Sequence, residues 1–237
     1  MSRFEKIVLN ALRAPTYRLE VSKVDDVGSR YRSIRFSAPE LLAAQETPPT
    51  FWLRLWIPVD GEEYQRAYTV TEVRRDEGTF ACLFKLHDGD GVAVEWARAA
   101  EPGQALRATV YGPKRFAVPA PAPAGYLLVG DPCSLPAIND ILRTLPDSVP
   151  AKVVLVEDHD GLSVAGGEVH WCATPAEVTA ALGELGRLEG WHAWVATESG
   201  LTREVRGVVQ EALGVRKQDI TAQGYWTRGR AMGRARR

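Results

Sequence analysis

The first half of the chain alternates apolar and polar residues in short runs, which is the period of a half-buried strand. We predict six strands in this half, at residues 18–24, 31–37, 51–58, 67–73, 79–86 and 105–111. A helical pattern at residues 92–99 interrupts them. Strands of this length, joined by turn pairs such as Asp60-Gly61, are typical of an antiparallel β-barrel.

The pattern changes after Pro119-Ala-Pro-Ala-Pro123, where three prolines at alternate positions favour an extended linker. Beyond it, strand patterns at 126–130, 152–157, 168–171, 191–196 and 220–223 alternate with helical patterns at 134–145, 175–185 and 201–213. This alternation indicates a mostly parallel sheet with right-handed crossovers. We therefore predict a β-barrel domain over residues 1–120 and an α/β domain over residues 124–237.

Composition and charge narrow the class of protein. The 237 residues suffice for two compact domains, and a formal net charge of −1 gives no general attraction to nucleic acid. No apolar run approaches the roughly 18 residues of a membrane span, and the N-terminus lacks a signal-peptide pattern. We expect a cytoplasmic protein that binds neither nucleic acid nor membrane. The basic segment 228–237 is interpreted as a solvated tail, with an anion-recruiting patch as the alternative.

The cysteines and histidines are widely spaced. Cys82, Cys133 and Cys172 form no Cys-x-x-Cys pair, and the four histidines are scattered singly. We therefore expect neither a disulfide framework nor a metal site.

Three separated segments carry candidate chemistry. On the predicted strand Arg66-Ala-Tyr-Thr69, Arg66 and Tyr68 share one face. A flavin needs such groups: a ring to stack on, donors for its oxygens and a cation for its pyrophosphate. The second segment, His87-Asp-Gly-Asp-Gly-Val-Ala-Val-Glu-Trp-Ala97, opens a helix whose first N–H groups favour an anion. With Gly224-Tyr-Trp-Thr-Arg-Gly229, these segments indicate a flavin site, although each alone also suits an ordinary strand, helix or loop.

In this order the segments resemble the siderophore-interacting proteins, FAD-dependent ferric-siderophore reductases related to the ferredoxin–NADP reductases. The resemblance extends to Tyr111-Gly-Pro-Lys114, Leu127-Leu-Val-Gly-Asp131 and Leu135-Pro-Ala-Ile138. It implies a ferredoxin-reductase-like fold: a six-stranded antiparallel barrel followed by a mostly parallel, dinucleotide-type sheet. It further implies FAD as cofactor, and NADPH, NADH or an electron-donor protein as the source of electrons.

The resemblance also implies roles for individual residues. The positions that it places at the cofactor are Arg66, Tyr68, Thr69, His87, Gly91, Val92, Ala93, Trp96, Asp131, Tyr225 and Trp226. It further implies that Arg54, Lys114 and Arg228 hold an anionic or oxygen-rich ferric siderophore, at one mouth of a cleft between the domains. Without the resemblance, the three cations could as well be ordinary solvent-facing side chains. In the same way, Tyr225 and Trp226 could as well be aromatic residues of the core. No catalytic residue is assigned, because the redox chemistry belongs to the cofactor.

Four positions depart from the family pattern. At the flavin, Thr71 stands where the family has Arg, and Val94 where it has Ser. Losing these two phosphate contacts would weaken flavin binding by about 2–4 kcal/mol, or about thirty- to a thousand-fold. At the nicotinamide side, Pro132 replaces Glu and Thr197 replaces Gly.

Two functions therefore stay open. One is an FAD-dependent reductase of ferric siderophores or a related small-molecule redox reaction. The other is the same scaffold with weakened or lost flavin or nicotinamide use, acting as a non-redox enzyme or binding protein in specialised metabolism.

Overall fold

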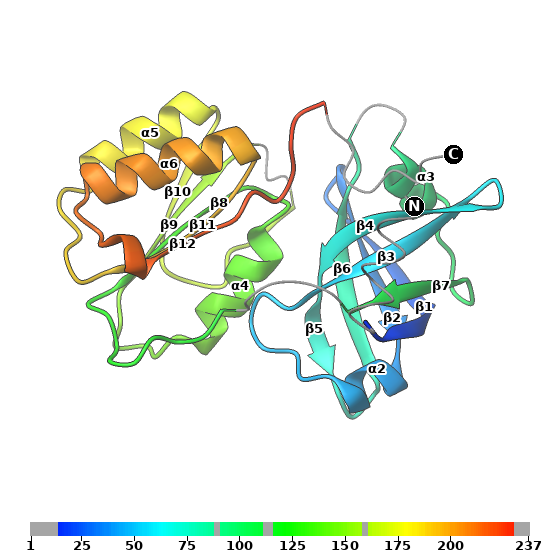
Figure 1. The fold of residues 1–237 in the computed structure, drawn as a ribbon. Coiled ribbons are helices and arrows are strands. Elements are labelled where there is room, and N and C mark those ends of the chain that lie inside the picture. Colours follow the sequence, from blue (N-terminus) through cyan, green and yellow to red (C-terminus); the bar gives the residue numbers. More distant parts are fainter. Residues whose placement is uncertain (1–13, 88–90, 111–115, 158–160, 230–237) are drawn as a thin grey trace. The chain divides into compact units, whose positions relative to one another are not determined.

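The computed structural model describes residues 14–87, 91–110, 116–157 and 161–229. The chain divides into two compact units between residues 115 and 116 (Figure 1). No helix in the described ranges has the length and apolarity needed to span a bilayer. The domain bounds inferred from the sequence, 1–120 and 124–237, stay predictions.

The first unit is a seven-stranded antiparallel sheet in the order β4-β3-β7-β1-β2-β6-β5. Its elements are β1 (Thr16–Val27), β2 (Tyr31–Ser37), α2 (Pro39–Ala44), β3 (Trp52–Val59), β4 (Glu62–Thr69), β5 (Thr71–Arg74), β6 (Thr79–Lys85), α3 (Val92–Arg98) and β7 (Ala105–Thr109). The two edge strands, β4 and β5, are joined by Val70 alone. Since one residue spans less than about 4 Å, the sheet must curl until its edges lie close together, as in a barrel wall.

The expected strand at 67–73 is in fact parts of two strands, because β4 ends at Thr69 and β5 begins at Thr71. β4 also reaches back to Glu62, across a turn in which Asp60 and Gly61 both have positive φ angles of 50° and 79°. Those angles are typical of a tight hairpin. The strand 62–66 is hard to recognise because an edge strand is often rich in charge. Helix α2 was not predicted, since six residues are too few to show a helical period.

The second unit is a parallel sheet in the order β10-β9-β8-β11-β12. Its elements are β8 (Tyr126–Gly130), α4 (Leu135–Thr144), β9 (Ala151–Val156), β10 (Glu168–Cys172), α5 (Pro175–Glu184), β11 (His192–Ala196), α6 (Ser199–Glu211), a 3-10 turn (Lys217–Asp219) and β12 (Ile220–Ala222). Helices α5 and α6 pack on one face of the sheet and α4 on the other. An antiparallel barrel followed by an α/β sheet is confirmed as the fold class. The barrel sheet has seven strands and not the predicted six, because the segment 67–73 is divided between β4 and β5.

The strand order creates a switch point at the carboxyl edge of the parallel sheet. From β8 the chain moves outward to β9 and β10, and it then returns to place β11 on the other side of β8. Open α/β sheets bind ligands where the strand order reverses in this way. Here that point lies between Asp131, which follows β8, and Thr197, which follows β11.

Gly130, the last residue of β8, allows α4 to approach the sheet closely. A Cβ atom at this position would lie 2.4 Å from Ile138 Cδ1 and 2.5 Å from Ser134 Oγ. These distances are far shorter than van der Waals contacts, so the neighbours would have to shift.

We predict that Gly130→Ala lowers the free energy of unfolding by about 1–3 kcal/mol, because the added methyl overpacks this contact. Urea denaturation measures the change. Gly183→Ala is the matched control: its Cβ meets nothing within 4 Å, and alanine at this helical position should stabilise by up to about 1 kcal/mol. Equal stabilities of the two variants would contradict the prediction.

Candidate functional site

In the barrel unit, the pairing of β3 with β4 places Arg66 and Tyr68 on one face. Arg66 lies opposite Leu55, and Tyr68 lies opposite Leu53. Directly paired residues project to the same side of an antiparallel sheet, and both leucines are fully buried. Arg66 and Tyr68, both half-buried, therefore lie on the core side of this sheet. The Arg66 Nη1 atom donates a hydrogen bond to the backbone oxygen of Gln65 at 2.7 Å.

An aromatic cluster of Tyr68, Phe84, Trp96 and Phe36 supports this face. The Tyr68 ring centroid lies 4.1 Å from that of Phe84, with the planes inclined by 30°. Phe84 lies 5.7 Å from Trp96, which stacks on Phe36 at 6.3 Å. Helix α3 contributes Trp96, so the helix and the strand that carries Tyr68 share one cluster. The half-buried Tyr68 ring is thus fixed in position, which suits stacking on a flat ligand.

Helix α3 begins at a glycine and has no side-chain cap. A Cβ atom on Gly91 would lie 3.2 Å from Cε1 of the exposed His87, so the helix start passes close to that imidazole. The N–H groups of Val92 and Ala93 donate to no residue within the described part of the chain. Amides at such a position favour an anion.

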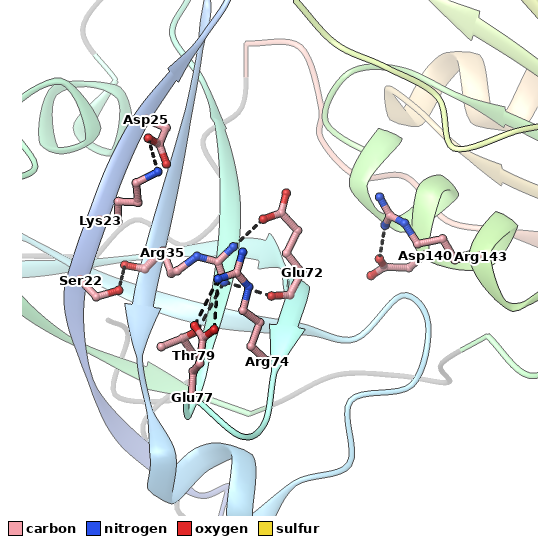
Figure 2. Close-up of polar contacts among 10 residues, drawn as sticks. All are labelled: Ser22, Lys23, Asp25, Arg35, Glu72, Arg74, Glu77, Thr79, Asp140 and Arg143. Carbon is pink, nitrogen blue, oxygen red and sulfur yellow. Dashed lines mark hydrogen bonds and ion pairs between the residues drawn. The ribbon is translucent and has the colours of Figure 1, made fainter.

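The segment after Thr69 has a structural role of its own. Glu72 has a positive φ of 49°, and its carboxylate accepts a bond from Arg35 Nη2 at 2.5 Å. Arg35 also donates to the Glu72 backbone oxygen at 3.1 Å, as Figure 2 shows. Thr71 and Arg74 flank a register shift against β6. The sequence 71–74 thus forms a bulge that Arg35 stabilises.

The described structure places only two of the three predicted substrate-binding cations, and they lie in different units. Arg54 pairs with Ala67 and Thr109, so it lies on the opposite face of the sheet from Tyr68. Its guanidinium lies 5.4 Å from the Trp52 ring centroid, a cation–π distance. Lys114 lies outside the described residues, and Arg228 belongs to the second unit. Their convergence stays a prediction.

In the second unit, the Asp131 carboxylate joins three parts of the chain. It is 1% exposed, and its Oδ1 atom accepts bonds from the N–H groups of Cys133 at 2.9 Å and Ser134 at 3.1 Å. Its Oδ2 atom accepts a bond from Trp226 Nε1 at 2.8 Å. The structure thus brings the predicted residues Asp131 and Trp226 into direct contact, which the sequence did not indicate.

The C-terminal segment 224–228 lies across the switch point. The Tyr225 N–H donates to the Thr197 oxygen at 2.9 Å, and the Ser199 N–H donates to the Trp226 oxygen at 2.8 Å. The Tyr225 ring meets Trp194 edge-on, with centroids 6.0 Å apart. A Cβ atom on Gly224 would lie 2.5 Å from Ser199 Oγ. Only a residue without a side chain permits this close approach.

The side chain of Thr197, which stands where the family pattern has Gly, packs inside the second unit. Its side chain is fully buried, and its hydroxyl lies 3.0 Å from that of Thr202 on α6. Thr202 Oγ1 also accepts the Thr197 N–H at 3.1 Å. The added atoms therefore pack inside the unit.

Burial raises the pKa of Asp131 to about 6. Hydrogen bonds from Trp226, Ser134 and Cys133 oppose the rise, and the negative charge of Glu157 adds to it. Glu198 differs: burial opposes its ionisation, but bonds from the Gly200, Leu201 and Arg228 N–H groups, together with the charge of Arg228, outweigh that effect and lower its pKa.

We predict that Asp131 makes the free energy of unfolding depend on pH. Its folded pKa lies above the unfolded value, so its stabilising contribution is complete below about pH 4 and is lost as pH rises through about 6. The unfolding free energy of the native chain, minus that of Asp131→Asn, should therefore fall by up to about 3 kcal/mol between pH 4 and pH 7. Urea denaturation at several pH values measures this difference. A difference that does not change with pH would refute the assignment.

Two family models match the chain. Residues 123–229 match the siderophore-interacting protein, and residues 37–116 match the siderophore-interacting FAD-binding domain. The mycobactin import ATP-binding/permease protein IrtA of Mycolicibacterium thermoresistibile is 35% identical over 98% of this chain. The chain spans 27% of the length of that relative. The ferric acinetobactin reductase of Acinetobacter baumannii is 23% identical over 81% of this chain and 70% of its own length.

Solved structures share the fold. A siderophore-interacting protein from A. baumannii superposes with a TM-score of 0.79 and 20% identity, covering 92% of this chain and 93% of that one. A ferredoxin–NADP+ reductase from Plasmodium falciparum gives 0.68 and 8%, covering 89% and 96%. The two units thus form a ferredoxin-reductase-like fold. With both family models matched in order along it, the chain belongs to the siderophore-interacting protein family.

Proposed function

We propose that the chain is an FAD-dependent reductase that transfers electrons to the Fe(III) of a siderophore in the cytoplasm. The observation that carries the proposal is the Arg66–Tyr68 pair on one face of β4, with the Tyr68 ring fixed by Phe84. The match of residues 37–116 to an FAD-binding domain supports it. Two relatives are named for mycobactin import and for ferric acinetobactin reduction, which supports a ferric siderophore as substrate.

The chemistry of these residues fits FAD. Tyr68 presents a ring for stacking on the flavin, and Arg66, on the same face, supplies a cation for its pyrophosphate. The N–H groups at the start of α3 supply further donors for a phosphate. Thr69, 7% exposed, stays in the proposed set as a hydroxyl beside Tyr68. Bound FAD supplies electron transfer, and the protein supplies binding and orientation.

The substrate gains one electron for each iron, which converts Fe(III) to Fe(II). Hard oxygen chelators hold Fe(II) less strongly than Fe(III), so reduction favours release of the metal. We assign Arg54, Lys114 and Arg228 to the anionic or oxygen-rich chelate, each contributing about 1–2 kcal/mol that weakens with salt. The electrons come from a nicotinamide nucleotide or a carrier protein.

We predict that Tyr68→Ala and Arg66→Ala each weaken FAD binding at least about tenfold, through lost stacking and a lost charge-assisted bond. The Arg66 effect should shrink at high salt. Quenching of flavin fluorescence measures the affinity. Arg18→Ala is the control, because Arg18 is an exposed barrel arginine paired with Glu20. If the native chain purifies colourless and binds no added FAD, the proposed function is wrong and the scaffold without flavin use takes its place.

A separate prediction concerns the chelate. Arg228→Ala should weaken binding of a ferric siderophore about tenfold at low salt, with little change in melting temperature, because alanine keeps the backbone N–H through which Arg228 bonds to Glu198. Arg216→Ala is the matched control, since Arg216 is exposed and pairs with Asp219. Tryptophan fluorescence titration measures both affinities. Unchanged affinity in Arg228→Ala at low salt would remove Arg228 from the site.

A further inference from the structure

Helix starts at the carboxyl edge of an α/β sheet are the usual places for a dinucleotide pyrophosphate, because their first N–H groups lack partners within the helix. A dinucleotide therefore needs those groups to be available at the switch point. In this chain the relevant helices are α4, which follows β8, and α6, which follows β11.

The N–H groups leading into α4 all donate to Asp131. Cys133 and Ser134 donate to its carboxylate, and Leu135 donates to its backbone oxygen at 2.9 Å. Pro132 has no N–H to offer. In return, the Asp131 N–H donates to Ser134 Oγ at 2.9 Å. This reciprocal arrangement is a capping box, and it leaves no donor in this turn for a phosphate.

The start of α6 is satisfied in the same way. The Glu198 carboxylate accepts bonds from the N–H groups of Gly200 at 2.5 Å and Leu201 at 3.2 Å. The Ser199 N–H donates to the Trp226 oxygen at 2.8 Å. The Glu198 carboxylate thus accepts from the amides that a pyrophosphate would need, and its negative charge would repel the pyrophosphate.

The remaining helix of the unit, α5, follows the edge strand β10 and therefore starts away from the switch point. At α5, the Thr174 hydroxyl accepts the Glu177 N–H at 3.3 Å, and the Glu177 carboxylate accepts the Ala173 N–H at 2.8 Å. Gly130, which ends β8 beside the switch point, is used for packing against Ile138 and Ser134. Within the described residues, side chains thus accept N–H groups at the starts of α5 and α6 and in the turn that leads into α4.

We propose that the α/β unit does not hold a nicotinamide dinucleotide at its switch point, because Asp131, Glu198 and the segment 224–228 already occupy the groups that would bind the pyrophosphate. The flavin is then reduced by a donor that does not use this edge, of the class of reduced electron-carrier proteins. The inference rests on the proposed function only for the presence of a flavin, because the binding step itself involves no redox chemistry.

The first test is calorimetric titration of the FAD-loaded chain, and of the chain without FAD, with NADP+ and with inorganic pyrophosphate. We expect no saturable binding below about 1 mM, and only slow bleaching of the flavin by NADPH compared with dithionite. Saturable 1:1 binding of NADP+ with a dissociation constant below about 0.1 mM overturns the proposal. The proposed function is tested separately, by measuring FAD affinity and the reduction of a ferric siderophore by the chain after dithionite has reduced its flavin. The proposed function and the inference about the dinucleotide can therefore fail independently.

The second test compares two variants at one position. Glu198→Ala removes the charge and frees the Gly200 and Leu201 amides, so pyrophosphate affinity should rise at least about tenfold. Glu198→Ser removes the charge but keeps a hydroxyl that caps the helix, so the affinity should rise much less. Circular dichroism checks that both variants fold. Equal affinities of Glu198→Ala and the native chain for pyrophosphate overturn the proposal, because capping would then not be what excludes the phosphate.

Discussion

The second unit depends on one buried carboxylate. Asp131 accepts hydrogen bonds from Cys133 and Ser134 and from the Trp226 indole, so a single side chain joins the end of β8, the start of α4 and the C-terminal segment. A buried carboxylate without partners would be expensive, and its raised pKa shows that three donors do not fully offset that cost. The partners must therefore stay in place, and this requirement fixes the edge of the sheet where related folds bind ligands.

The two units differ in how the N–H groups at their helix starts find acceptors. A helix start needs acceptors for its first amides, and this chain meets the need differently in each unit. Acidic side chains cap α4 and α6 from within, whereas α3 begins at Gly91 with no side-chain cap. Donors suited to an anion therefore remain in the barrel unit, on the helix whose Trp96 shares an aromatic cluster with Tyr68. In the α/β unit the corresponding N–H groups already donate to Asp131 and Glu198.

The sequence predicted the fold and the barrel site more completely than the contacts at the carboxyl edge of the parallel sheet. Alternation and the Arg-x-Tyr-Thr pattern place Arg66 and Tyr68 on one face, because strand period is a local property. The hairpin strand 62–66 was missed, since its charges hide its period. The Asp131–Trp226 bond joins residues 95 positions apart, and no local pattern reports such a pairing. Pro132 departs from the family pattern, yet it lies in the turn that Asp131 caps before α4, where its missing N–H leaves no donor unpaired.

The positions that depart from the family pattern are better understood in pairs with the residues they contact. Thr197 bonds to Thr202, and Glu72, next to Thr71, bonds to Arg35. Each pair satisfies polar groups within its own unit. In the barrel, Arg66 and Tyr68 still share one face of β4. At the switch point, the chain's own acceptors bond to the amides that we propose a pyrophosphate would need. Under the proposed function, the barrel unit supplies the flavin site, and the electrons reach it by a route that does not need a dinucleotide at the switch point.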